Sequence, residues 1–192
     1  MGHDASSPDA IAFALDHPQR TIHLVLLNPM FGHLPSLKLP EMIRLLADPA
    51  LVALADAMMN DEAQRLWLLQ LTADNWGIDA GDPEGIAVTS ILLQFFGGAD
   101  HPDALVAIRA WTAGLFDSLG EELVDSGALR DLEVPVSIIF GESDRYPDPS
   151  LAHEIAGLFT DPSLHLVPEA SHWPQHDQSR VVAALLTDIV SV

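Results

Sequence analysis

The sequence VPVSIIFGESD, residues 134–144, predicts a buried strand that ends in a turn carrying an acidic residue. Its first seven residues are mostly apolar or β-branched, as in strands that are covered on both faces of a parallel sheet. Gly141 to Asp144 then supply turn-forming residues. The sequence LVPEASHWPQ, residues 166–175, repeats this order, because a short apolar strand gives way to a turn that carries His172.

Helices alternate with the predicted strands. A third strand is predicted over residues 21–28 (TIHLVLLN), and it is preceded by a helix with Ser7 as its N-cap and Pro8 in its first turn. Further helices are predicted over residues 149–159 and from about Asp177 onward. This alternation predicts an α/β protein with a short parallel sheet flanked by helices.

The middle of the chain has a different pattern. From about residue 34 to residue 115 the sequence predicts only helices, separated by turns such as Asp48-Pro49. One of these helices, residues 91–96, is apolar and ends at Gly97-Gly98. We therefore expect a core part, an all-helical insertion or cap, and a second core part, over residues 1–33, 34–116 and 117–192.

The composition excludes several classes of function. The 192 residues include 28 Asp and Glu but eight Lys and Arg, which gives a formal net charge of −20. Such a surface repels phosphate backbones and anionic lipids, so we expect no nucleic-acid or membrane partner. There is no cysteine, which excludes disulfides and thiol catalysis, and no apolar run is long enough to span a bilayer. We expect a cytoplasmic protein.

Asp144 and His172 follow two successive predicted strands. Loops at the carboxyl ends of parallel strands converge on one crevice, so the two side chains are expected to meet. A carboxylate beside a histidine fixes the tautomer of the ring and stabilises its protonated form, as a general base requires. Each residue taken alone has a simpler interpretation, a turn aspartate and a loop histidine without a role. The pair favours a catalytic site.

A third candidate lies at the start of the chain. Gly2-His3-Asp4-Ala5-Ser6 precedes a helix and then a strand, which is the order of a strained strand-to-helix turn of the form Gly-x-nucleophile-x-Gly. Asp4 takes the nucleophile position, although Ser6 stands where glycine is usual. The chain order is then nucleophile, acid and base.

These segments resemble the α/β-hydrolase superfamily. Residues 3–29, HDASSPDAIAFALDHPQRTIHLVLLNP, resemble its nucleophile elbow, the following helix and the sixth strand. Residues 134–144 and 166–175 resemble its seventh- and eighth-strand motifs. The resemblance implies a partial α/β-hydrolase with a helical cap. Its nucleophile, acid and base would be Asp4, Asp144 and His172, similar to the branch of haloalkane dehalogenases and epoxide hydrolases.

This branch implies a covalent ester on Asp4. A carboxylate is ionised at neutral pH and attacks without a base, after which His172 activates water to hydrolyse the ester. The backbone N–H of Ala5 is the implied oxyanion donor, and no cofactor is implied. The substrate stays open between haloalkane, epoxide and ester. Dehalogenases of this branch carry Trp in place of Ala5, and epoxide hydrolases use cap tyrosines, whereas the single tyrosine, Tyr146, lies beside the acid.

Four tryptophans are candidates for lining a substrate pocket. The helical spacing of the first three with leucines favours packing in the core, and the fourth follows the histidine candidate. The four are Trp67, Trp76, Trp111 and Trp173. His172 and His176 have the spacing of a metal pair, but Pro174 between them argues against a helix there, so we expect no metal site.

Two functions follow from the sequence. The resemblance implies five strands before the elbow that the 192 residues do not include. We therefore expect residues 21–28 to form an open sheet edge, and nothing near Asp4 in the sequence to enforce the strained turn. The first hypothesis is a hydrolase of a small apolar substrate. The alternative is a catalytically inactive truncated remnant, or an assembly subunit that forms a homo-oligomer through the exposed edge.

Overall fold

The structure, a computed structural model, describes residues 1–78, 102–114, 124 and 127–191. It divides the chain into two compact units, residues 1–38 together with 119–192, and residues 39–118. The helix predicted over residues 91–96 lies outside the described residues. Within the described part, no helix is both long enough and apolar enough to cross a membrane.

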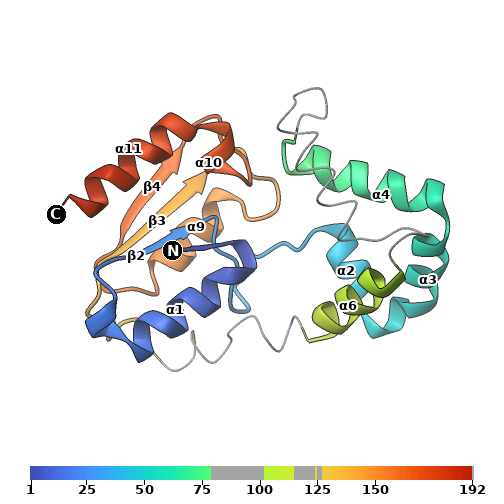
Figure 1. The fold of residues 1–192 in the computed structure, drawn as a ribbon, viewed down its shortest axis with the longest axis horizontal. Helices are drawn as coiled ribbons and strands as arrows, with labels where there is room; N and C mark the ends of the chain where they lie inside the picture. The colour runs from blue at the N-terminus through green and yellow to red at the C-terminus, as the bar shows by residue number, and fades with distance from the viewer. Residues whose placement is uncertain (79–101, 115–123, 125–126, 192) are drawn as a thin grey trace. The chain divides into compact units, whose positions relative to one another are not determined.

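A parallel sheet forms the centre of the first unit (Figure 1). Neighbouring strands are all parallel; Leu26 pairs with Ile138, which in turn pairs with Leu164. The predicted fold class, an α/β protein with a short parallel sheet, is therefore confirmed. In spatial order the strands are β1 (Gly2–His3), β2 (Leu24–Leu27), β3 (Val136–Gly141) and β4 (Ser163–Val167).

β2 and β3 begin later than the sequence pattern predicts. The 3-10 turn η2 (Pro18–Arg20) precedes β2, and Ile22 is 84% exposed, so the chain enters the sheet only at Leu24. β3 begins after Pro135, whose nitrogen has no hydrogen to donate to a neighbouring strand. The carbonyl of Pro135 still accepts the Leu24 N–H at 2.8 Å, so the two strands are aligned from their first residues.

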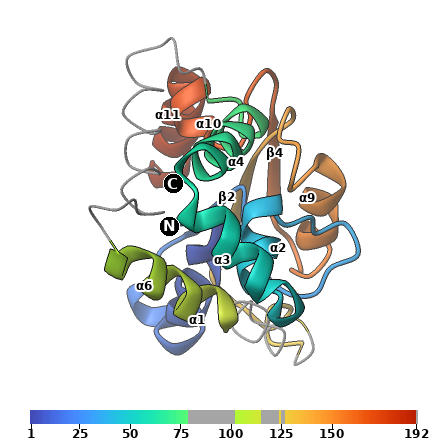
Figure 2. The ribbon, with the colours of Figure 1, turned by 90° about the vertical axis from the view of Figure 1, so that its right-hand side faces the viewer.

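Helices cover both faces of the sheet. On one face, α1 (Ser7–Asp16) and α9 (Pro149–Ala156) pack against alternate strand residues such as Leu26 and Ile138, both fully buried. On the other face, α11 (Ser179–Val190) packs against the residues in between, such as Leu27 and Ile139. Figure 2 shows α9 and α11 on opposite sides of the sheet. Each fully buried Leu or Ile contributes about 1.5–3 kcal/mol, which explains why the strands are apolar on both faces.

Two helix starts differ from the predictions. α1 begins at Ser7, so Ser6 is the N-cap residue, and its side chain makes no capping hydrogen bond. α10 (Pro174–Asp177) is a short helix in the segment where Pro174 was expected to prevent one. The prediction was wrong because proline at the first helical position loses no intrahelical hydrogen bond and has a suitable φ angle.

The second unit contains helices, and its described residues, 39–78 and 102–114, include no strand. Trp76 is buried, whereas Trp67 and Trp111 are 57% and 47% exposed, so the expected core packing is wrong for these two. The side chain of Asp61 accepts the Gln64 N–H at 3.0 Å and so caps the start of α4. The helices are α2 (Glu41–Ala47), α3 (Val52–Asn60), α4 (Glu62–Asn75) and α6 (Pro102–Ala113).

Candidate active site

Asp4 lies in a strained strand-to-helix turn. Its φ angle is 51°, a left-handed conformation that non-glycine residues adopt at a cost of about 1–2 kcal/mol. It directly follows β1 and opens the 3-10 turn η1 (Asp4–Ser6), after which α1 begins. A Cβ atom at Gly2 would lie 2.9 Å from the Cα of Ser7, so the glycine permits the close approach of strand and helix.

Contacts within the turn and to the sheet hold this conformation. The hydroxyl of Ser6 donates to the His3 carbonyl at 2.7 Å and accepts the His3 N–H at 3.0 Å. β1 pairs with β2, and the Met30 N–H donates to the Asp4 carbonyl at 3.3 Å. The expectation that nothing local enforces the turn was therefore wrong, because Ser6 in the second glycine position itself closes it. β1 also covers part of the edge of β2 that was expected to be open.

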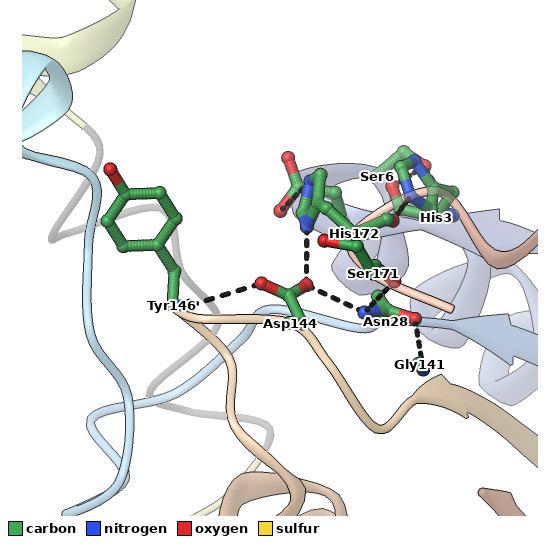
Figure 3. A network of polar contacts seen from close by, with 9 residues as sticks. His3, Ser6, Asn28, Gly141, Asp144, Tyr146, Ser171 and His172 are labelled. Carbon is green, nitrogen blue, oxygen red and sulfur yellow. Dashed lines mark hydrogen bonds and ion pairs between the residues drawn. The ribbon is translucent and has the colours of Figure 1, made fainter. Parts of the chain in front are cut away.

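Asp144 and His172 form a buried pair, as predicted from the strand ends (Figure 3). The His172 Nδ1 lies 2.8 Å from the Asp144 Oδ2, and the two residues are 2% and 4% exposed. Asp144 lies just after β3, and His172 lies between β4 and α10. The Tyr146 N–H donates to the other carboxylate oxygen at 3.1 Å, while the tyrosine ring points away from the carboxylate in Figure 3.

Asp4 lies on the other side of the same imidazole. The His172 Nε2 is 3.9 Å from the Asp4 Oδ1, an ion-pair contact longer than a hydrogen bond. The Asp4 side chain is 32% exposed, whereas that of His172 is 3% exposed. The structure therefore brings the three predicted residues together, with the accessible carboxylate at one ring nitrogen and the buried carboxylate at the other.

The neighbouring carboxylates control the charge of His172. Burial lowers the pKa of His172, but the hydrogen bond to Asp144 and the charges of Asp4, Asp144 and Asp177 outweigh it, so the pKa is raised above its ordinary value. Formation of an ester on Asp4 would remove one of these charges. The pKa of His172 would then fall, so a larger fraction of the rings would be neutral, the form that can accept a proton from water.

Asn28 joins these segments and was missed as a site residue. It directly follows β2, is fully buried, and has a φ angle of 35°. Its Nδ2 donates to the Asp144 Oδ2 at 2.7 Å and to the Ser171 carbonyl at 3.3 Å. Its Oδ1 accepts the Gly141 N–H at 3.0 Å. In the sequence, Asn28-Pro29 has only the signal of a turn, because the hydrogen-bond partners of Asn28 lie at least 113 residues away along the chain.

His3 is a second residue that the sequence did not single out. Its Nε2 lies 2.9 Å from the His172 carbonyl oxygen. Its ring centre is 5.2 Å from that of His172 and 4.7 Å from that of Trp173. Burial is the largest influence on the pKa of His3 and lowers it, so the neutral ring donates through Nε2 to the carbonyl. His3 thus connects the elbow to the loop that carries His172.

The other candidate residues differ in their relation to the cluster. Trp173 packs edge-on against the His172 ring at 5.5 Å, and Ala5 lies in η1 directly after Asp4. His176 pairs with Asp177 at 3.1 Å. Within the described ranges, no group of three or more potential ligands could hold a metal ion. Trp67, Trp76 and Trp111 belong to the second unit.

The chain has the fold of part of an α/β-hydrolase. It is similar to a 2-hydroxy-6-oxo-6-phenylhexa-2,4-dienoate hydrolase of Rhodococcus sp. strain RHA1, with a TM-score of 0.71 and 15% identity, over 100% of this chain and 63% of that one. A thermophilic esterase from Thermogutta terrifontis gives a TM-score of 0.69 and 16% identity, over 99% of this chain and 63% of the esterase. At these identities the likeness shows the fold alone.

Curated relatives are hydrolases of the same fold. A 2-hydroxy-6-oxo-6-phenylhexa-2,4-dienoate hydrolase of Burkholderia cepacia is 22% identical over 200 residues. A 2-hydroxy-6-oxononadienedioate/2-hydroxy-6-oxononatrienedioate hydrolase of Comamonas testosteroni is 21% identical over 199 residues. All of this chain is matched in both, and it spans 62% of the length of each relative. The sequence matches no known protein-family profile.

Proposed function

We propose that the chain belongs to a hydrolase that acts on a small apolar substrate through a covalent ester on Asp4. One observation carries the proposal: His172 lies between Asp4, 3.9 Å from its Nε2, and Asp144, 2.8 Å from its Nδ1. The two curated relatives, both named hydrolases, support hydrolysis as the class of reaction. The choice of Asp4 as nucleophile rests on its place in the strained elbow.

The proposed reaction has two steps. First, a carboxylate oxygen of Asp4 forms a bond to an electrophilic carbon, and the bond from that carbon to a halide or to an epoxide oxygen breaks. A halide leaves as the anion, whereas the epoxide oxygen stays on the substrate and takes a proton from water. Second, His172 takes a proton from water, and the resulting hydroxide attacks the carbonyl carbon of the Asp4 ester. The bond between that carbon and the oxygen that Asp4 gave to the substrate then breaks. The departing alkoxide takes the proton of the new carboxyl group, which releases an alcohol and restores the Asp4 carboxylate with one oxygen from water, and His172 returns its proton to solvent. The N–H of Ala5 is proposed to stabilise the negative charge on the carbonyl oxygen.

The position of Asp4 favours attack at an alkyl carbon over an acyl carbon. A carboxylate that attacks an acyl group produces a mixed anhydride, whereas attack at an alkyl carbon produces a stable ester that needs an activated water. The 3.9 Å gap between the Asp4 Oδ1 and the His172 Nε2 fits a base that acts on water and does not need to deprotonate its nucleophile. The relatives named as dienoate hydrolases and esterases mark acyl substrates as the competing class.

The test is to trap the ester. His172→Gln should leave attack intact and block hydrolysis, so incubation with 1-bromobutane or styrene oxide should add the corresponding mass to the Asp4 peptide. The matched control is the double variant with Asp4→Asn, which should show no adduct. If neither probe modifies Asp4, the Asp-ester mechanism is wrong. A burst of nitrophenol from p-nitrophenyl acetate without an alkyl adduct would instead favour the acyl class.

The second candidate is a catalytically inactive remnant or an assembly subunit. Among the described residues, β1 pairs with only Leu26 and Leu27 of β2, so Leu24 and Val25 have no strand partner on that side. Unpaired strand edges favour pairing with another chain. Light scattering tests this candidate directly: a stable homo-oligomer that shows no adduct in the trapping experiment supports it, and a monomer contradicts the assembly role.

A further inference from the structure

Asn28 meets conditions that few side chains satisfy together. Its backbone is left-handed, with φ of 35°, a region that Asn and Asp tolerate better than other non-glycine residues. The residue is fully buried, so each polar atom of its amide requires a partner. Both the oxygen and the nitrogen of the amide have one, and the partners belong to separate segments of the chain. The side chain is therefore fixed in a single orientation.

The partners also decide which way the amide faces. The backbone N–H of Gly141 can only donate, so the atom 3.0 Å from it must be the acceptor Oδ1. The Nδ2 group then faces the Asp144 Oδ2 at 2.7 Å and the Ser171 carbonyl at 3.3 Å, both of which accept. A flipped amide would place donors against a donor and an acceptor against acceptors. The hydrogen-bond partners alone thus decide the positions of Oδ1 and Nδ2, and no assumption about the reaction is needed.

The amide restrains the carboxylate that binds His172. The Asp144 Oδ2 accepts from both Asn28 and His172, at 2.7 and 2.8 Å, and its Oδ1 accepts the Tyr146 N–H. A rotation of the carboxylate would break at least one of these bonds. The amide Nδ2 of Asn28 can only donate, so the Asp144 Oδ2 is the acceptor in this bond. The bond from the His172 Nδ1 to this carboxylate places a proton on Nδ1. In the neutral ring, the unprotonated nitrogen is then the Nε2, which faces Asp4.

We infer that Asn28 is a positioning residue, which holds the Asp144 carboxylate and the His172 loop so that the Nε2 of His172 faces Asp4. Its hydrogen bond to the Ser171 carbonyl restrains the residue directly before His172. This inference rests on the proposed function for its role in catalysis. The geometry that it predicts can be measured without any substrate.

Two substitutions separate the amide from the backbone conformation. Asn28→Gly favours the left-handed backbone and removes the side chain. Asn28→Asp keeps the size of the side chain and an acceptor for the Gly141 N–H, but replaces the donor by a carboxyl group next to Asp144. Two adjacent carboxyl groups share a proton at low pH, and the shared proton restores a donor between them. Among the described residues, the titratable groups that act on His172 or His3 include Asp4 on η1 and Asp177 on α10 as well as Asp144.

The measurement is the proton NMR resonance of the His172 Nδ1–H, assigned by its loss in His172→Gln. In the unsubstituted protein we expect a slowly exchanging, downfield signal. Asn28→Gly should lose it at every pH, while Asn28→Asp should show it at acid pH and lose it as the shared proton leaves. The inference is wrong if Asn28→Gly keeps the Nδ1–H signal of His172. It is also wrong if this signal does not change with pH in Asn28→Asp. If Asn28→Gly fails to give the circular dichroism spectrum of the unsubstituted protein, the pH dependence of Asn28→Asp decides.

The kinetic consequence is tested with the alkyl probes. Attack by Asp4 does not use His172, so Asn28→Gly should form the Asp4 ester at an unchanged rate but hydrolyse it about tenfold more slowly, or slower still. An unchanged hydrolysis rate would overturn the positioning role. If no probe gives an adduct even in His172→Gln, the proposed function fails. The NMR experiment then still tests whether Asn28 positions the pair.

Discussion

Gly141→Ala is expected to displace the loop that carries His172. Gly141 is the last residue of β3, and a Cβ atom there would lie 2.0 Å from the Ser171 carbonyl oxygen and 2.6 Å from that of Ala170. Ordinary carbon–oxygen contacts are about 3.3 Å or longer, so the loop must move by roughly 1.3 Å. Both atoms belong to the backbone, so no side-chain rotation relieves the overlap.

The cost follows from this overlap. Overpacking a close-packed site lowers the free energy of unfolding by about 1–3 kcal/mol. Because the added Cβ would collide with two backbone carbonyl oxygens, we expect a loss at the upper end of this range, about 3 kcal/mol. For a chain of this length that corresponds to a fall in Tm of about 6–12 °C. The matched control is Gly127→Ala, because Gly127 has a φ of 71° but nothing within 4 Å of its added Cβ. It should cost only the backbone strain, about 1–2 kcal/mol.

The assay is urea unfolding followed by tryptophan fluorescence, with the free energies of unfolding of the two variants compared. The Nδ1–H resonance of His172 in Gly141→Ala reports the local displacement. If Gly141→Ala is no less stable than Gly127→Ala and the resonance is unchanged, the close packing of β3 against the base loop is not as inferred.

Two further predictions concern His172 and its neighbours. Asp4→Asn removes a negative charge that raises the pKa of His172, so an NMR titration should give a lower value than in the unsubstituted protein; an equal or higher value would contradict the electrostatic argument. Because the folded-state pKa is raised, protonated His172 stabilises the fold fully below its unfolded value of about 6.5, and this stability is lost as the pH rises through the folded-state pKa. Asp4→Asn should narrow the pH range between the unfolded-state and folded-state pKa values of His172, because it lowers the folded-state value. His3→Phe keeps an aromatic ring beside Trp173 but loses the donor to the His172 carbonyl, so unfolding should be easier by about 1 kcal/mol and amide exchange in the His172 loop faster. Unchanged exchange would show that His3 does not hold the loop.

The sequence by itself determined the sheet and the three residues that meet at its carboxyl edge. Buried parallel strands are apolar on both faces, so segments such as residues 134–144 are recognisable without their neighbours. Asp144 and His172 follow such strands directly, and the topology of a parallel sheet then requires their turns to lie side by side. Asp4 was identified from the local pattern of its elbow.

Tertiary structure decided how these residues are held. Asn28 is 116 residues from Asp144 along the chain, and His3 is 169 residues from His172, so no local pattern could assign their hydrogen bonds. Ser6 stands where glycine is usual in the elbow, and only the structure shows that its hydroxyl closes the turn around His3. The patterns of strands and turns depend on neighbours in sequence, whereas the orientation of a buried polar side chain depends on partners that only the folded chain brings within hydrogen-bond distance.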